Sequence, residues 1–156
     1  DKGVFKSGLQ DDSEQTIKYH TATHLLNAAL KLVLGKDCHQ MGSNITVDRL
    51  RFDFPCNHKL EAEEIKKLED IVNGWIKDDL KVTHEEMPKT KAVEIGAEHQ
   101  FIERYPDVVT VYSIGDVSKE ICTGPHVEHT GVLGEFKITK EESSASGVRR
   151  IKAILK

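Results

Sequence analysis

Cysteine is scarce in this chain, which has only Cys38, Cys56 and Cys122 among its 156 residues. Because their number is odd and their spacing is wide, they argue against a secreted disulfide framework and favour a reducing compartment. Apolar runs are also short, and none approaches the roughly 20 residues that cross a bilayer. We therefore expect a cytoplasmic protein without a membrane partner.

An excess of basic residues is also missing, since 22 Lys and Arg stand against 26 Asp and Glu, a net charge of -4. A chain of this sign is not a general nucleic-acid binder, so we expect no DNA partner, and any RNA contact needs a local basic patch. One candidate patch is the C-terminal segment RRIKAILK, residues 149–156. No glycine-rich phosphate loop is present, so we expect no ATP-dependent ligation in this chain.

The patterns that are present predict one α+β domain, which the chain length also favours. Residues 13–35 and 61–77 space their apolar residues three and four apart, as amphipathic helices do. Other segments alternate apolar and polar residues, as strands do. We therefore expect helices packed on a mainly antiparallel sheet, with a polar loop at residues 140–147. The expected strands are 40–47, 50–54, 81–87, 107–116, 134–142 and 147–155, with a short helix at 89–95.

Two histidines interrupt the apolar face of the first predicted helix. His20 and His24 are four residues apart, so their rings project side by side from one face. Cys122 and His126 have the same spacing in the turn segment CTGPH. Together the four residues supply one thiolate and three imidazoles, a donor set that suits tetrahedral Zn²⁺. The open alternative is a packed pair of histidines, the commoner meaning of this spacing when it stands alone.

The role of such a metal depends on how its coordination is filled. Four protein ligands would close a tetrahedral site, whereas a catalytic zinc keeps one position open. We therefore leave open whether Cys122 is a permanent ligand. A HEXXH metalloprotease is excluded, because Thr21 and Ala22 stand where that motif would carry its general base.

Five segments that span nearly the whole chain carry a further signal: HTATHLLNAAL, QMGSNIT, LRFDF, CTGPHVEHTGVLGEFKI and SASGVRRIKAIL. Together they resemble the editing domain of alanyl-tRNA synthetase and the free-standing alanyl-tRNA editing deacylases. The resemblance implies the fold of the threonyl/alanyl-tRNA synthetase second additional domain. It also implies one editing domain over residues 1–156, with residues 1–12 as a lead-in and 13–156 as the core. The start at Asp1 and the likeness of FKSGLQDDSE to the lead-in of the full synthetase favour an excised piece of that enzyme.

The same resemblance implies zinc-dependent hydrolysis of tRNA(Ala) wrongly charged with serine or glycine. The zinc ligands it implies are His20, His24, Cys122 and His126. These residues would also serve catalysis, through the metal that they bind. The implied partners are the 3′ acceptor end of that tRNA and the rest of the synthetase.

Two alternatives stay open. Most alanyl members read CGGTH where this chain reads CTGPH, and the Gly-Pro-His ending resembles the related domain of threonyl-tRNA synthetase. Editing of seryl-tRNA(Thr) is therefore one alternative. The other is a zinc-stabilised tRNA-binding module that performs no catalysis.

Substrate selection requires a polar group in the pocket, because a hydrogen bond to the serine hydroxyl would favour serine over alanine. Thr23, Gln40 and Ser43 are the candidates, and Gln40 also resembles the pocket glutamine of the family. The alternative, which we weight equally, is that Gln40 is a strand residue whose side chain hydrogen-bonds to the backbone. Arg149 lies in the GVRRI segment of the family and is a further candidate for substrate binding.

Overall fold

The computed structural model describes residues 13–156, so the predicted lead-in, residues 1–12, lies outside the described residues. The two long helices are α1 (Glu14–Leu34) and α2 (Ala62–Lys77). Both lie close to the predicted bounds. No helix in the described part of the chain is long and apolar enough to cross a membrane.

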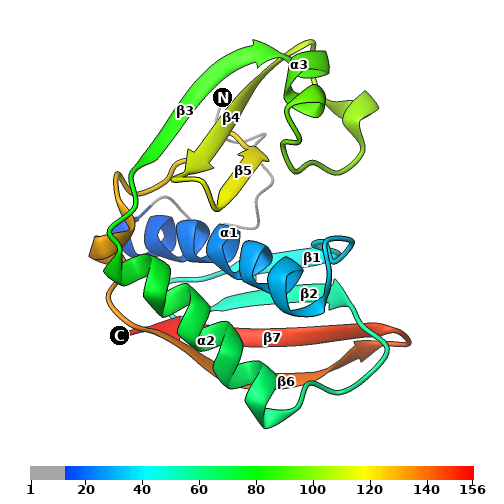
Figure 1. The fold of residues 1–156 in the computed structure, drawn as a ribbon, viewed down its shortest axis with the longest axis vertical. Helices are drawn as coiled ribbons and strands as arrows, with labels where there is room; N and C mark the ends of the chain where they lie inside the picture. Colours follow the sequence, from blue (N-terminus) through cyan, green and yellow to red (C-terminus); the bar gives the residue numbers. More distant parts are fainter. Residues whose placement is uncertain (1–12) are drawn as a thin grey trace.

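The strands form two antiparallel sheets, one with the order β1-β2-β7-β6 and one with the order β3-β4-β5. Figure 1 shows α1 lying between them. The expected α+β class is confirmed, with the strands divided between two sheets instead of one. The strand bounds are β1 (Gly42–Ile45), β2 (Leu50–Pro55), β3 (Val82–Pro88), β4 (Val108–Ile114), β5 (Ser118–Ile121), β6 (Phe136–Ala145) and β7 (Val148–Leu155). The short helices are α3 (Lys89–Glu94), η2 (Ile102–Arg104) and η3 (Thr130–Leu133).

Helix α1 is buried on more than the predicted apolar face. Ser13 caps its start by accepting the Thr16 N–H, and Gly35, with φ of 124°, ends it. Because sheets lie on both sides of the helix, polar residues are buried beside the apolar ones. The buried polar residues of α1 are Thr16, His20, Thr21, Thr23, His24 and Asn27.

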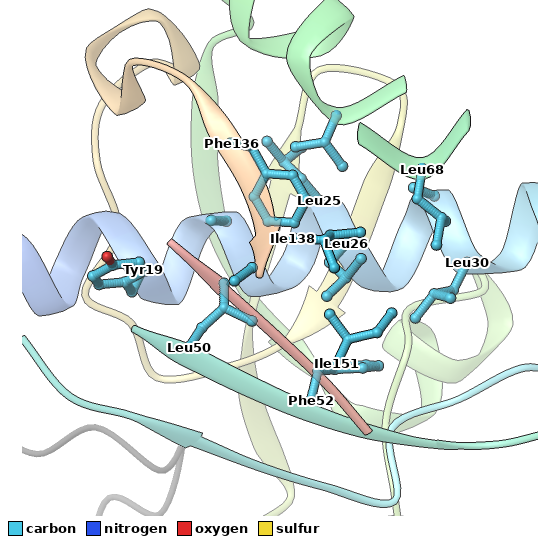
Figure 2. Packing of buried hydrophobic residues seen from close by; sticks show 14 of the residues in the cluster. Tyr19, Leu25, Leu26, Leu30, Leu50, Phe52, Leu68, Phe136, Ile138 and Ile151 are labelled. Carbon is cyan, nitrogen blue, oxygen red and sulfur yellow. The ribbon is translucent and has the colours of Figure 1, made fainter. Parts of the chain in front are cut away.

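The main hydrophobic core lies between the helices and the four-stranded sheet. Figure 2 shows leucines of α1 packed on Phe52 of β2 and Ile151 of β7. Alternation along these strands points the apolar residues to the helices, so the charged residues between them lie on the opposite face. A smaller apolar cluster lies on the three-stranded sheet: Met87, Ala92, Ala97, Val109 and Val111.

One local prediction was wrong, and one short strand was not predicted. The predicted loop at 140–147 is largely strand, because β6 continues to Ala145 in register with β7 and pairs Glu142 with Arg150. The turn shrinks to the residues before Val148. The short strand β5 was not predicted, since four residues give too little alternation to recognise.

Candidate metal centre

Two of the predicted metal ligands project from α1 and are almost fully buried. His20 is 3% exposed and His24 is 4% exposed. Their ring centroids are 5.2 Å apart, as expected for residues one helical turn apart. They belong to the side of α1 that faces β5, because His24 contacts Glu120 of that strand.

The other two predicted ligands lie in the loop that follows β5. Cys122 comes directly after the strand, and the ring of His126 stacks on that of His20 with centroids 4.2 Å apart. Gly124, between them, has φ of 73°, in the region that favours glycine. A Cβ at this position would lie 2.5 Å from Tyr112 Oη. Glycine is therefore needed for the tight turn that directs both side chains to α1.

The spacing of the four donor atoms fits a shared metal ion. These atoms all lie within 4.8 Å of one another. Cys122 Sγ is 3.5 Å from Nε2 of His20 and 3.5 Å from Nε2 of His126. A thiol has one proton and cannot donate to both nitrogens. Tetrahedral bonds of about 2.3 Å from zinc to sulfur and about 2.0 to 2.1 Å to nitrogen would separate the two ligand atoms by about 3.5 Å.

The backbone orients the ring of His20. The carbonyl of Pro125 lies 2.9 Å from His20 Nδ1 and accepts its proton. Nε2 therefore keeps its lone pair and faces the sulfur of Cys122. Metal-binding histidines generally make such a bond through the nitrogen that does not bind the metal.

Thr21 orients the ring of His126 in the same way. Its hydroxyl donates to the carbonyl of Ile17, at 3.3 Å, and accepts the N–H of Val127, at 3.1 Å. The same oxygen lies 2.9 Å from His126 Nδ1. Since its one proton is already used, His126 Nδ1 must be the donor, and Nε2 is left with a free lone pair. Sequence reasoning missed this role of Thr21, because its partners lie 105 and 106 residues away.

Burial keeps the cluster uncharged at neutral pH. Desolvation lowers the pKa of His20 to about 4, against the opposing effect of its bond to Pro125. Desolvation, with repulsion between neighbouring imidazoles, also holds the pKa of His24 and of His126 well below the usual range. Burial raises the pKa of the Cys122 thiol to about 12. The imidazoles thus have lone pairs to donate at neutral pH, while the thiol would lose its proton to solvent only when a cation binds its sulfur.

A largely buried carboxyl group, that of Glu120, lies next to His24, with 17% of the Glu120 side chain exposed. Oε2 of Glu120 is 3.6 Å from His24 Nδ1, a nitrogen that has no hydrogen-bond partner within the described chain. The side-chain amide of Asn27 donates to the same oxygen at 3.4 Å. Burial, and next the charge of Glu98, raise the pKa of Glu120 to about 8. Glu120 was also missed from the sequence, because it belongs to the unpredicted strand β5.

The predicted substrate-binding residues lie on several elements. Thr23 is buried in α1 and donates its hydroxyl to the Tyr19 carbonyl at 2.9 Å. Gln40 lies in the segment that connects α1 to β1, and Ser43 lies on β1; both are half-buried. Arg149 lies on β7. Their role stays a prediction.

Arg149 is already paired within the protein. Its guanidinium contacts the carboxylate of Glu141 through two hydrogen bonds, of 2.7 and 2.9 Å. The Glu141 side chain is 3% exposed and also accepts the Leu60 N–H. This pair ties β6 and β7 to the segment that leads into α2.

Comparison with known proteins adds to this geometry. Residues 109–152 match the family described as threonyl and alanyl tRNA synthetase second additional domain. The alanine–tRNA ligases of Treponema denticola and Borreliella burgdorferi are 59% and 57% identical over 152 residues, which is 97% of this chain. The alanine–tRNA ligase of Thermotoga maritima is 50% identical over 141 residues, or 90% of this chain. The chain is a homologue of one region of the alanine–tRNA ligases.

That region is a minor part of each alanine–tRNA ligase. The alignments take in 25% and 26% of the two spirochaete enzymes and 16% of the Thermotoga enzyme. The chain thus spans about a quarter of the length of the first two. The second additional domain match includes Cys122 and His126, whereas His20 and His24 precede it. The longer alignments with alanine–tRNA ligases reach over nearly all of the chain and so take in both halves of the cluster.

Proposed function

We propose that this chain hydrolyses the ester bond of tRNA(Ala) that carries serine or glycine, and that it does so with zinc as the editing part of an alanine–tRNA ligase. The observation that carries the proposal is the cluster of His20, His24, Cys122 and His126 in a homologue of those enzymes. His20 and His24 are buried, Cys122 and His126 are half-buried, and hydrogen bonds through Nδ1 orient the rings of His20 and His126. Stability alone does not require four such side chains in one place.

Zinc bound there would supply a Lewis acid for an ester carbonyl or for a water molecule. The protein's own part is to fix the donors. Pro125 and Thr21 hold the rings of His20 and His126, and Glu120 stands behind His24. Positioned donors of this kind are what a reaction on an already activated ester needs from the protein.

Selection of serine is assigned to Thr23, Gln40 and Ser43. The hydroxyl of Thr23 uses its proton on the Tyr19 carbonyl and so keeps acceptor capacity for the hydroxyl of a serine substrate. The rest of the ligase and the 3′ end of the tRNA are the partners that this function requires. A threonyl substrate is less favoured, because the relatives compared above are all alanine–tRNA ligases.

The test is a deacylation assay on the purified chain with zinc. We expect hydrolysis of seryl-tRNA(Ala) and glycyl-tRNA(Ala), with alanyl-tRNA(Ala) spared. Seryl-tRNA(Thr) as substrate decides the threonyl alternative. Binding of tRNA(Ala) without release of the amino acid would leave only the binding module.

The ligand assignment has its own variant. His24→Ala should remove both bound zinc and hydrolysis. The matched control is His39→Ala, because His39 is exposed and its Nδ1 lies 3.0 Å from the carbonyl oxygen of Asp37, away from the cluster. Zinc retained by His24→Ala at the wild-type ratio would contradict the assigned site.

A further inference from the structure

The four-stranded sheet has a charged face that points away from the helices. Ion pairs connect six charged residues on this face: Arg51, Asp53, Lys140, Glu142, Arg150 and Lys152. Asp53 binds Arg150 through two hydrogen bonds, of 2.9 and 3.1 Å, and lies 3.9 Å from Arg51 Nε. Glu142 lies 3.3 Å from Lys140 Nζ and 3.6 Å from Lys152 Nζ. Together these contacts span β2, β7 and β6.

Three of these side chains form a cationic row across the sheet: Arg51, Lys152 and Lys140. In the strand register Arg51 pairs directly with Lys152, and Lys152 pairs directly with Lys140. Adjacent strands lie about 4.8 Å apart, so the row extends over about 10 Å. The side chains of Arg51, Lys152 and Lys140 are 29%, 35% and 60% exposed, so each keeps some accessible surface, although Nε of Arg51 is itself buried.

The charge of this face is opposite to that of the whole chain. Four bases against two acids leave the six residues with a net charge of +2, whereas the chain carries -4. Like charges directly opposite each other weaken strand pairing. The direct pairing of the three cations therefore opposes folding, and the contacts with Glu142 and Asp53 offset part of this repulsion.

We propose that the cationic row of Arg51, Lys152 and Lys140 binds the phosphate backbone of the RNA on which the chain acts. Phosphates of one strand follow each other at about 3.4 Å along the axis of a DNA duplex, and on that scale a row of about 10 Å has the length of roughly three nucleotides. Backbone contacts of this type position a nucleic acid without reading its sequence. That this RNA is tRNA(Ala) rests on the proposed function; the surface itself rests on the register and the contacts.

The experiment measures the salt dependence of binding to uncharged tRNA(Ala). The test variant carries Arg51→Gln, Lys140→Gln and Lys152→Gln. The control variant makes the same change of net charge elsewhere, with Lys36→Gln, Lys67→Gln and Lys77→Gln, three exposed lysines outside the sheet. Dissociation constants are compared between 50 and 200 mM salt, about the range in which counterion release dominates.

We expect the slope of log affinity against log salt to fall by about two to three in the test variant, at roughly 0.7 to 0.9 for each lost phosphate contact. The control variant should keep the wild-type slope. Zinc content and the urea midpoint of the test variant show that it is folded, and neither should fall. If the single variant Lys140→Gln is used instead, the slope should fall by about one.

Equal slopes for the test and control variants would overturn the proposal, and would leave the face to a protein partner such as another part of the ligase. Failure of hydrolysis is a separate result, since uncharged tRNA is the probe. A chain that binds tRNA through this row and hydrolyses nothing refutes the proposed function but not the surface. A chain that hydrolyses seryl-tRNA(Ala) with an unchanged slope refutes the surface alone.

Discussion

Replacement of Thr21 by valine tests whether a hydroxyl on α1 orients a ligand from a distant loop. Valine has nearly the shape of threonine and carries a methyl group in place of the hydroxyl. That oxygen accepts the His126 Nδ1–H at 2.9 Å and the Val127 N–H at 3.1 Å. Thr21 is 0% exposed, so water cannot replace the lost acceptor.

The magnitude follows from the two donors left without a partner. A buried donor that loses its acceptor costs about 1 to 3 kcal/mol, so without metal the Thr21→Val chain should lose about 2 kcal/mol or more of unfolding free energy. Loss of a partner that orients a metal ligand typically lowers metal affinity about 10- to 100-fold. We expect zinc affinity to fall within that range.

The assay combines two measurements and one control. Urea unfolding in the presence of a chelator gives the free energy of the metal-free chain, and competition with a chromophoric chelator gives the zinc affinity. Thr21→Ser keeps the hydroxyl and loses one methyl group, at about 1 kcal/mol. It should therefore be slightly destabilised and bind zinc like the wild type.

Two results would refute the reasoning. If Thr21→Val binds zinc as tightly as the wild type, the hydroxyl does not position His126. If Thr21→Ser loses as much zinc affinity as Thr21→Val, packing of the methyl group is responsible instead.

Three further predictions concern the loop, the buried ion pair and the metal. Gly124→Ala should lower both the stability and the zinc affinity, because a Cβ at this position would clash with Tyr112. Gly147→Ala is the control, because Gly147 has a similar φ of 76° but open space around it, and it should lose only about 1 to 2 kcal/mol of unfolding free energy. Equal losses for the two variants in urea unfolding would contradict the clash. Burial opposes ionisation of Glu141, but its bonds to Arg149 and to a backbone N–H bring its pKa below the usual value. As the pH falls, the unfolded chain binds this proton at a higher pH than the folded chain does. The contribution of the Glu141–Arg149 pair to stability should therefore be full above about pH 4.5 and be lost as the pH falls further, through the lower pKa of the folded chain. In the Glu141→Gln variant this contribution to the pH dependence of the unfolding free energy should disappear. A pH dependence equal to that of the wild type would contradict the role of the pair. Removal of zinc by a chelator should lower the melting temperature, and added zinc should restore it in proportion to RT ln(1 + [L]/Kd); a melting temperature independent of zinc would argue against the site.

Part of the site could be predicted from local spacing. A separation of four places two side chains on one helical face whatever the tertiary structure, so His20 and His24 could be recognised as a pair. Cys122 and His126 lie in a loop, so helical geometry does not apply to them; they could be recognised by their residue types in a short turn marked by Gly124 and Pro125. The choice of donors, one thiol and three imidazoles, also suggested zinc.

Other parts depended on contacts between distant segments. Thr21 looked like an ordinary helix residue until the loop after β5 brought His126 and Val127 to its hydroxyl. Glu120 is informative only because β5 pairs with β4 and places its carboxyl group beside His24. No periodicity in the sequence reports such a pairing.

The sequence by itself predicted the two long helices, most strands and the four candidate metal ligands, because these predictions rest on residue types and on spacing along the chain. Tertiary structure decided that the strands form two sheets with α1 between them, and this arrangement buries both sides of the helix. Burial in turn made the imidazoles neutral and their hydrogen bonds obligatory, since a buried polar group without a partner is costly. It also decided that Arg51, Lys152 and Lys140 stand in one row, because strand register joins residues that are 101 and 12 positions apart.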